Sequence, residues 1–285
     1  MNFRELILND FSQNAKQHSV VNFNPEQTDS DYDPAPFEPG QSYCRIWLVE
    51  MCLQKNMEFF KTRYPVVHSA IRFNHGDHEV AIPYIAGPGF LKELAQENLD
   101  RIIQLNHALT PLFPFNHGTV ELQAGLFSME ASDWINKFIN TLGRFSKLLP
   151  VPELSSVMHL AAPVYSGIED LMGISGSRLE LGCRQTFSST SRGNMLKPGY
   201  FAVILADQEE VENLHLCIVS DQLRAWQPKE GQKSGTRHKP LEGYSYMLFH
   251  IEKRDCQEWE ALTRIKNLVD QAVDAVLNGS SFLIL

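Results

Sequence analysis

Histidine and acidic side chains crowd into one short segment whose residues are typical of a turn. His75, Asp77 and His78 lie close together there, and imidazole and carboxylate groups are ligands that zinc and other divalent ions prefer. Their spacing differs from HExxH on a helix, and a solvated hairpin tip also collects polar residues. One hypothesis is therefore a metal-dependent hydrolase centred on these three residues and completed by His107 or His117.

The other catalytic and ligand-binding motifs are absent or incomplete. The sequence has no GxSxG nucleophile elbow and no GxxxxGK[ST] or GxGxxG phosphate-binding loop. Asp29, Asp31 and Asp33 alternate as calcium ligands would, but Pro34 follows them and breaks the EF-hand pattern. Cys256 has basic neighbours that favour a reactive thiolate, but no histidine partner can be placed beside it. We therefore expect no catalytic residue and no cofactor.

A basic segment over residues 224–239 contains Trp226, Lys233 and Arg237 together with glycine and serine. Cations next to an aromatic ring can hold single-stranded nucleic acid through backbone charge and base stacking. The same residues can contact a partner protein, or form a solvated loop. A nucleic-acid-binding accessory subunit is a second alternative hypothesis.

Two amphipathic helices are expected within residues 132–172, and they carry Phe138 and Phe145. Such helices bind partner proteins or lipid surfaces, or pack against the protein's own sheet. Basic residues are scarce in this segment, whereas helices that lie on membranes have basic polar faces. We therefore expect Phe138 and Phe145 to contact a protein partner.

The elements around the histidine turn read as strands. Apolar and polar residues alternate over 66–73 and 79–85, which predicts a hairpin, and Pro83 places the second strand at an edge or bulge. Residues 43–53 are apolar on both faces, so their period does not separate a buried strand from a buried helix. We predict a strand there and another over 118–129.

Helical spacing recurs in three places. It predicts a helix over 91–103, the pair within 132–172, and a C-terminal helix up to Gly279. Asp255 and Glu258 form a capping box for the last of these.

Four further strands are expected over 178–187, 199–206, 214–223 and 244–251. The fold class is therefore expected to be α+β, with a mainly antiparallel, β-sandwich-like body of about eight strands. An inserted amphipathic helix pair and a C-terminal helix complete it.

The sequence is predicted to divide into three segments. Residues 1–41 form an irregular N-terminal lead-in, whose first ten residues have helical spacing. Residues 42–279 form one α+β domain, with the helical insertion at about 131–174. Residues 280–285 form a C-terminal tail.

Composition limits the kinds of partner. The 285 residues include 25 Lys and Arg against 34 Asp and Glu, a net charge of −9 that offers no global attraction to nucleic acid. Five scattered cysteines without a CxxC pair indicate reduced thiols. The sequence begins without a secretory signal pattern and contains no long apolar run, so we expect a cytoplasmic protein without a transmembrane segment.

The absence of a catalytic constellation favours binding over chemistry. We expect a non-catalytic intracellular protein-binding subunit or adaptor of a multiprotein assembly, whose partners are other protein subunits. Contact with nucleic acid is expected only through the basic 224–239 segment. The sequence determines neither the identity of the partner nor the oligomeric state.

Overall fold

The structure is a computed structural model that describes residues 18–54, 57–58, 61–75, 78–86, 102–116, 118–130, 178–189, 194–227 and 237–255. Most of these residues lie in strands, and the only α-helix within these ranges is the short α5 (Gln208–Glu212). The α+β class predicted from the sequence is therefore wrong, because antiparallel sheets build nearly all of the described part. The predicted helix pair and most of the predicted C-terminal helix lie outside the described residues.

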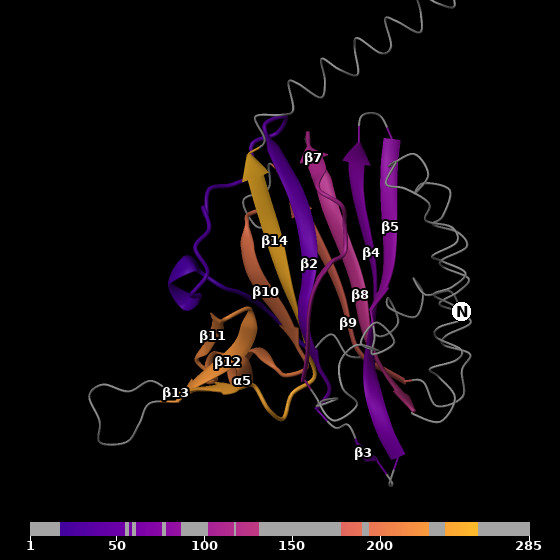
Figure 1. Ribbon diagram of the computed structural model, residues 1–285, viewed down its shortest axis with the longest axis vertical. Helices are drawn as coiled ribbons and strands as arrows, with labels where there is room; N and C mark the ends of the chain where they lie inside the picture. The colour runs from indigo at the N-terminus through magenta and orange to yellow at the C-terminus, as the bar shows by residue number, and fades with distance from the viewer. Residues whose placement is uncertain are drawn as a thin grey trace, which may run out of the picture.

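The largest sheet, called the first sheet, has the strand order β1-β10-β14-β2-β6 (Figure 1). Strand β7 also pairs with β2, and every pair in this sheet is antiparallel. Its strands are β1 (Ser19–Asn22), β2 (Ser42–Cys52), β6 (Ile102–Ala108), β7 (Phe113–Phe115), β10 (Gly199–Ile204) and β14 (Tyr246–Asp255). The first sheet thus joins the beginning of the described chain to its end.

Two further antiparallel sheets flank the first. In the second sheet β5, β4, β8 and β9 follow one another, and β3 pairs with the start of β4. Its strands are β3 (Met57–Glu58), β4 (Lys61–His75), β5 (His78–Ala86), β8 (Thr119–Glu130) and β9 (Arg178–Ser188). The third sheet consists of β11 (Leu216–Val219), β12 (Gln222–Gln227) and β13 (Arg237–Pro240). Figure 1 shows the second and third sheets on opposite sides of the first.

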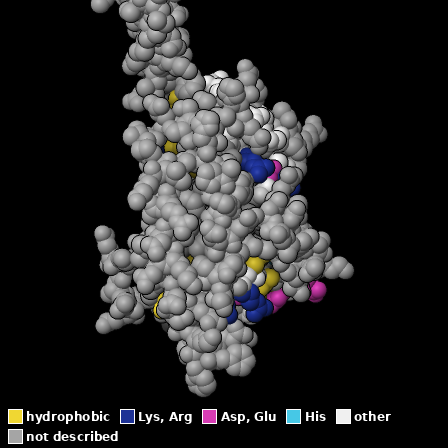
Figure 2. Space-filling model, turned by 90° about the vertical axis from the view of Figure 1, so that its right-hand side faces the viewer, with side chains coloured by type: hydrophobic (Ala, Val, Ile, Leu, Met, Phe, Trp, Pro, Cys, Tyr) yellow, Lys and Arg dark blue, Asp and Glu magenta, His cyan; other side chains and the backbone are white. Residues whose placement is uncertain are grey.

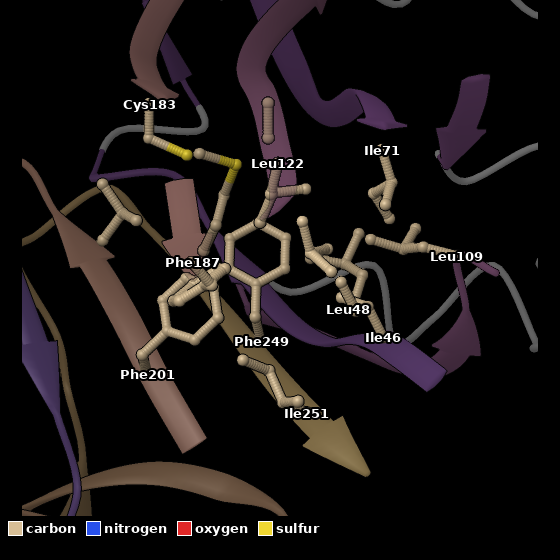
Figure 3. Packing of buried hydrophobic residues seen from close by; sticks show 14 of the residues in the cluster. Ile46, Leu48, Ile71, Leu109, Leu122, Cys183, Phe187, Phe201, Phe249 and Ile251 are labelled. Atoms are coloured by element: carbon tan, nitrogen blue, oxygen red, sulfur yellow. The ribbon is translucent and has the colours of Figure 1, made fainter. Parts of the chain in front are cut away.

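A hydrophobic core fills the space between the first and second sheets (Figure 3). Successive side chains of a strand point to opposite faces, so alternate residues of β14, and of β2 up to Leu48, enter this core. A register irregularity between Leu48 and Glu50 moves the next core position of β2 to Met51. Ile46 and Phe249 from the first sheet meet Ile71, Leu122 and Cys183 from the second. All five are buried, and burying such side chains is the main source of stability for the two-sheet body.

The other face of the first sheet is covered at one end. Ala202 of β10 and Leu248 of β14 belong to a second buried cluster, to which Ile218 and Leu223 of the third sheet also belong. Part of the first sheet is therefore buried on both faces. This double burial explains why the sequence of β2 is apolar without a clear alternation.

The hairpin predicted around the histidine turn is confirmed, with β4 and β5 in antiparallel register. Pro83 lies in β5, which pairs only with β4 among the described strands, so the predicted edge position is also confirmed. The strand interpretation of residues 43–53 is confirmed by β2.

Residues 214–223 do not form the single strand predicted from their apolar character. Ser220 and Asp221 make a tight turn between β11 and β12, with φ of +52° and +58°. Two consecutive residues in the left-handed region are typical of a two-residue hairpin turn. Neither glycine nor asparagine occupies this turn, so its usual signal is missing from the sequence.

The last residues of the helix predicted over 91–103 lie in a strand. Ile102 and Ile103 belong to β6 and pair with Cys52 and Met51 of β2. Asp255, predicted to cap the C-terminal helix, is the last residue of β14, and the residues after it lie outside the described part. Helical spacing was misleading at Ile102 and Ile103, because pairing with a neighbouring strand overrides a local pattern.

Segments predicted to be irregular also contain regular structure. The 1–41 lead-in includes β1, which pairs with β10 at the edge of the first sheet. The predicted acidic turn after β10 is the helix α5, whose N-cap Asp207 accepts a hydrogen bond from the Glu210 backbone N–H at 2.8 Å.

Within the described residues no helix is long and apolar enough to cross a membrane. Cys44, Cys52, Cys183 and Cys217 are free thiols, in agreement with the predicted reduced state. Burial raises the pKa of the Cys183 thiol to about 12, as expected for a cysteine that serves as a small hydrophobic residue.

Gly199 is required by both its backbone and its neighbour. Its φ is +129°, and a Cβ atom there would lie 2.8 Å from the Tyr32 hydroxyl oxygen. We expect Gly199→Ala to lower the free energy of unfolding by about 2 kcal/mol, measured by urea denaturation. Gly40→Ala is the control, because Gly40 also has a positive φ, +79°, but has open space around it. Equal losses in the two variants would contradict a role for Tyr32 packing.

Candidate functional site

A row of aromatic side chains crosses three neighbouring strands on the outer face of the first sheet. Tyr200 of β10 pairs in register with His250 of β14, which pairs with Trp47 of β2. The residues next to them in sequence, including Phe201 and Phe249, enter the core instead. Strand alternation therefore directs the row away from the core.

Trp47 is half-buried and is fixed from two directions. Its indole Nε1 donates a hydrogen bond of 2.8 Å to the Glu252 carboxylate. The Arg45 guanidinium carbon lies 5.3 Å from the centre of the indole ring, in the range of a cation–π interaction. The ring thus keeps one orientation on the sheet.

Glu252 organises the charges around Trp47. Its carboxylate also accepts a hydrogen bond of 2.5 Å from Arg254 Nε and lies 3.7 Å from Arg45 Nη1. Burial acts to raise the pKa of this carboxyl, but the hydrogen bonds from Trp47 and Arg254 and the charges of the two arginines lower it overall. Glu252 is therefore ionised at neutral pH, beside two guanidinium groups.

Tyr32 closes the aromatic row on its other side. Its ring meets the rings of Tyr200 and His250 edge to face, with centroid distances of 6.4 and 6.5 Å. Tyr200 and His250 stack at 4.4 Å. Burial lowers the pKa of His250 although the charges of Asp221 and Glu252 act to raise it, so its imidazole is neutral at pH 7.

The turn of the third sheet is attached beside this row. Tyr200 donates its hydroxyl hydrogen to Asp221, and the Ser30 hydroxyl lies 3.1 Å from the same phenol oxygen. Asp29 accepts hydrogen bonds of 2.8 and 3.0 Å from the Ser220 backbone N–H. These contacts hold the β11–β12 turn against Tyr200 and define one border of the aromatic row.

We call the group formed by these half-buried and exposed side chains the Trp47 surface. It comprises Tyr32, Arg45, Trp47, His250, Glu252 and Arg254. Its aromatic rings are fixed by packing and hydrogen bonds, and its charged groups lie next to them. Such an arrangement can bind a ligand that offers an apolar or planar group together with polar atoms.

A buried carboxyl connects the first sheet to the third. Glu50 of β2 is fully buried, and its Oε2 accepts a hydrogen bond of 2.7 Å from the Leu223 backbone N–H. Burial raises the pKa of this carboxyl to about 7, against the hydrogen bond from Leu223 and the charge of Arg224, which act to lower it. Glu50 holds the third sheet in place rather than contacting solvent.

A thiol and an imidazole meet on the third sheet, a pairing that the sequence did not indicate. Cys217 Sγ lies 3.3 Å from His238 Nδ1. Burial raises the pKa of Cys217, with a smaller raising contribution from Asp29 that Arg224 opposes. A protonated thiol is a poor nucleophile, so this pair is a weak candidate for catalysis.

Only two of the five predicted partner-binding residues, Trp226 and Arg237, belong to the described part of the structure. Trp226 in β12 and Arg237 in β13 lie in adjacent strands, one register position apart, so the two ends of the basic segment are joined by strand pairing. Lys233, Phe138 and Phe145 lie outside the described residues. On the face shown in Figure 2, the described basic side chains occur in small groups rather than in a continuous patch.

Two of the predicted metal ligands, His75 and His78, occupy the end of the β4–β5 hairpin. The backbones of His75 and His78 pair in register, while Asp77 and His117 lie outside the described residues. His107 stacks on the Tyr84 ring at 4.7 Å. The described part of the chain contains no group of three or more histidine, cysteine or acidic side chains that could hold a metal ion.

The residues of the Trp47 surface were missed in the sequence, although they left a signal. Arg45 and Trp47 alternate with core residues, and so do His250 and Glu252, with Arg254 at the next position of the same period. Each set is a polar face with a period of two, but only strand pairing brings the two sets together.

Comparisons of the chain with protein-family models, with curated proteins and with solved structures find no match. Function is therefore inferred from the side chains themselves.

The raised pKa of Glu50 predicts a pH dependence of stability. The folded-state pKa of Glu50 is about 7, against an ordinary value of 4.5. The protonated carboxyl therefore makes its full contribution to the free energy of unfolding below pH 4.5, and this contribution is lost as the pH rises through 7. Glu50→Gln keeps an acceptor for Leu223 without the charge. We expect its unfolding free energy, relative to wild type, to rise by about 2 to 3 kcal/mol between pH 5 and pH 8.

Urea denaturation at the two pH values measures this difference. Glu242→Gln, which changes an exposed carboxyl, is the control. A difference between Glu50→Gln and wild type that does not change with pH would show that Glu50 is not the titrating group.

Proposed function

We propose that the chain is a non-catalytic, protein-binding subunit or adaptor of a cytoplasmic assembly, and that it contacts its partner through the Trp47 surface. The observation that carries this proposal is the state of Trp47. A large aromatic ring lies only half-buried on the outer face of a sheet, and yet Glu252 and Arg45 fix its orientation.

The residue types support a protein partner. Tryptophan, tyrosine and arginine contribute most of the binding energy at protein interfaces, where they fill desolvated positions near the centre. Trp47, Tyr32 and Arg45 supply these three types on one surface. Arg254, with 60% of its side chain exposed, and the Asp33–Lys253 ion pair supply charged groups at the border.

Preorganisation is the second support. Association loses side-chain freedom, so rings that are already ordered in the free protein bind at a lower entropic cost. The stacking of Tyr200 on His250, and the hydrogen bond from Trp47 to Glu252, order the surface before any partner arrives.

The residues identified in the sequence as partner-binding are proposed to contact the same partner. Phe138 and Phe145 of the predicted amphipathic segment, with Trp226, Lys233 and Arg237, are proposed to widen the interface. They are apolar, aromatic or basic, and all of these types are suited to partner contact.

Replacement of the central ring tests the proposal. We expect Trp47→Ala to abolish, or weaken by about 100-fold, a stoichiometric complex with a protein that purifies with the chain under gentle conditions. Native mass spectrometry of the purified assembly measures this loss. Circular dichroism and urea denaturation verify that the variant is folded.

Tyr244→Ala is the matched control, because Tyr244 is another half-buried ring that packs against the second cluster, outside the Trp47 surface. We expect this variant to retain the complex. A native chain that is free of protein partners, or a complex indifferent to Trp47→Ala, would contradict the proposal.

A further inference from the structure

Arg45 stands out because its cationic group has almost no hydrogen-bonding partners. Its Nε is buried and unpartnered, and the guanidinium donates no hydrogen bond to any of the described residues. The nearest carboxylate, that of Glu252, lies 3.7 Å from Nη1 and already accepts hydrogen bonds from Trp47 and Arg254. A guanidinium has five donors, and leaving them unpaired in a partly buried site is costly.

The local charge is also unbalanced. Arg45 and Arg254 share one carboxylate, so the group of Arg45, Glu252 and Arg254 carries one net positive charge. The chain as a whole carries a net charge of −9. The neighbouring Lys253 is already paired with Asp33 at 3.4 Å and adds no net charge.

The position of Arg45 suits anion binding. Its guanidinium lies near the face of the Trp47 ring, which limits the orientations that this planar group can adopt. About a quarter of its side chain is exposed while Nε is buried, so a ligand would meet the Nη groups rather than Nε. A planar guanidinium held in this way presents a fork of donors that matches a carboxylate.

We propose that Arg45 is the anion-binding group of the Trp47 surface, and that it takes a carboxylate from an acidic side chain of the partner protein. Arg254 supplies a second positive charge beside it. Trp47 contacts the apolar or aromatic residue next to that acidic side chain. This inference rests on the proposed function, because it names the chemistry that the same surface recognises.

The test uses two synthetic peptides and the full chain. One peptide is acetyl-Gly-Glu-Phe-Glu-Gly-amide, and the other has glutamine in place of both glutamates. We expect the acidic peptide to bind and the amide peptide to bind about tenfold more weakly, in titrations followed by nuclear magnetic resonance at low salt. Equal binding of the two peptides would overturn the proposal.

Variants connect the binding to Arg45. We expect Arg45→Gln to weaken binding of the acidic peptide about tenfold, and Arg45→Lys to restore it only in part, because lysine keeps the charge but loses the planar fork. Arg184→Gln is the matched control, since Arg184 is already paired with Glu121 at 3.1 Å on the second sheet. Unchanged binding in a folded Arg45→Gln variant would overturn the proposal.

Two outcomes separate this inference from the proposed function. If Trp47→Ala loses the native complex while Arg45→Gln retains it, the surface binds a protein but recognises no acid there, and the inference is wrong. If the acidic peptide binds through Arg45 although no native protein complex exists, carboxylate recognition stands and the subunit proposal fails. Displacement of the peptide by inorganic phosphate at about tenfold lower concentration than by acetate would assign the site to phosphate and overturn the choice of a carboxylate.

Discussion

Antiparallel pairing of β2 with β14 creates the two faces on which the rest of the structure depends. The pairing runs from Ser42–Asp255 at one end to Cys52–Tyr246 at the other. Because side chains alternate along both strands, the same backbone hydrogen bonds direct one set of residues into the core and the other set outward. The register shifts once, between the Leu48–Phe249 and Glu50–Leu248 pairs. Between Ser42 and Leu48 the core and the Trp47 surface are therefore consequences of one register, and a slip by one residue would exchange them.

The first sheet also shows how surroundings set the behaviour of a carboxyl group. Glu50 and Glu252 both project from the outer face, but Glu50 lies under the third sheet with one backbone N–H as its donor. Glu252 receives hydrogen bonds from Trp47 and Arg254. The pKa of Glu50 is consequently raised and that of Glu252 lowered. One carboxyl holds two sheets together, and the other organises charges at the surface.

Local pattern predicted most of the strands but not their partners, since β2 and β14 were both expected as strands while their pairing was not. The β4–β5 hairpin is the exception, since alternation and a polar turn are both visible in the sequence. Ile102 and Ile103 illustrate the opposite case, because their helical spacing was overridden by pairing with β2. The turn at Ser220 and Asp221 was hidden, because it contains neither glycine nor asparagine and lies within an apolar run.

The candidate site was unpredictable for a related reason. The apolar run of β2 was interpreted as a core strand. Arg45 interrupts this run, and its role as part of a surface follows only from its position beside Glu252 on another strand. A sequence displays which residues alternate, but not which alternating strands will lie together. The histidine turn is the converse case, since its residues are adjacent in the chain and suggested a site by their types alone, and Asp77 lies outside the described residues.

Trp47 and Glu252 are separated by 205 positions in the chain. Closing so long a loop is entropically costly, so β14 pairs with β2 only after most of the chain is available. During synthesis the β2 strand leaves the ribosome long before its partner, with Trp47 lacking its hydrogen-bond acceptor and Arg45 lacking its counter-charge. A molecule that binds only the finished surface would therefore not bind nascent or truncated chains that end before Arg254.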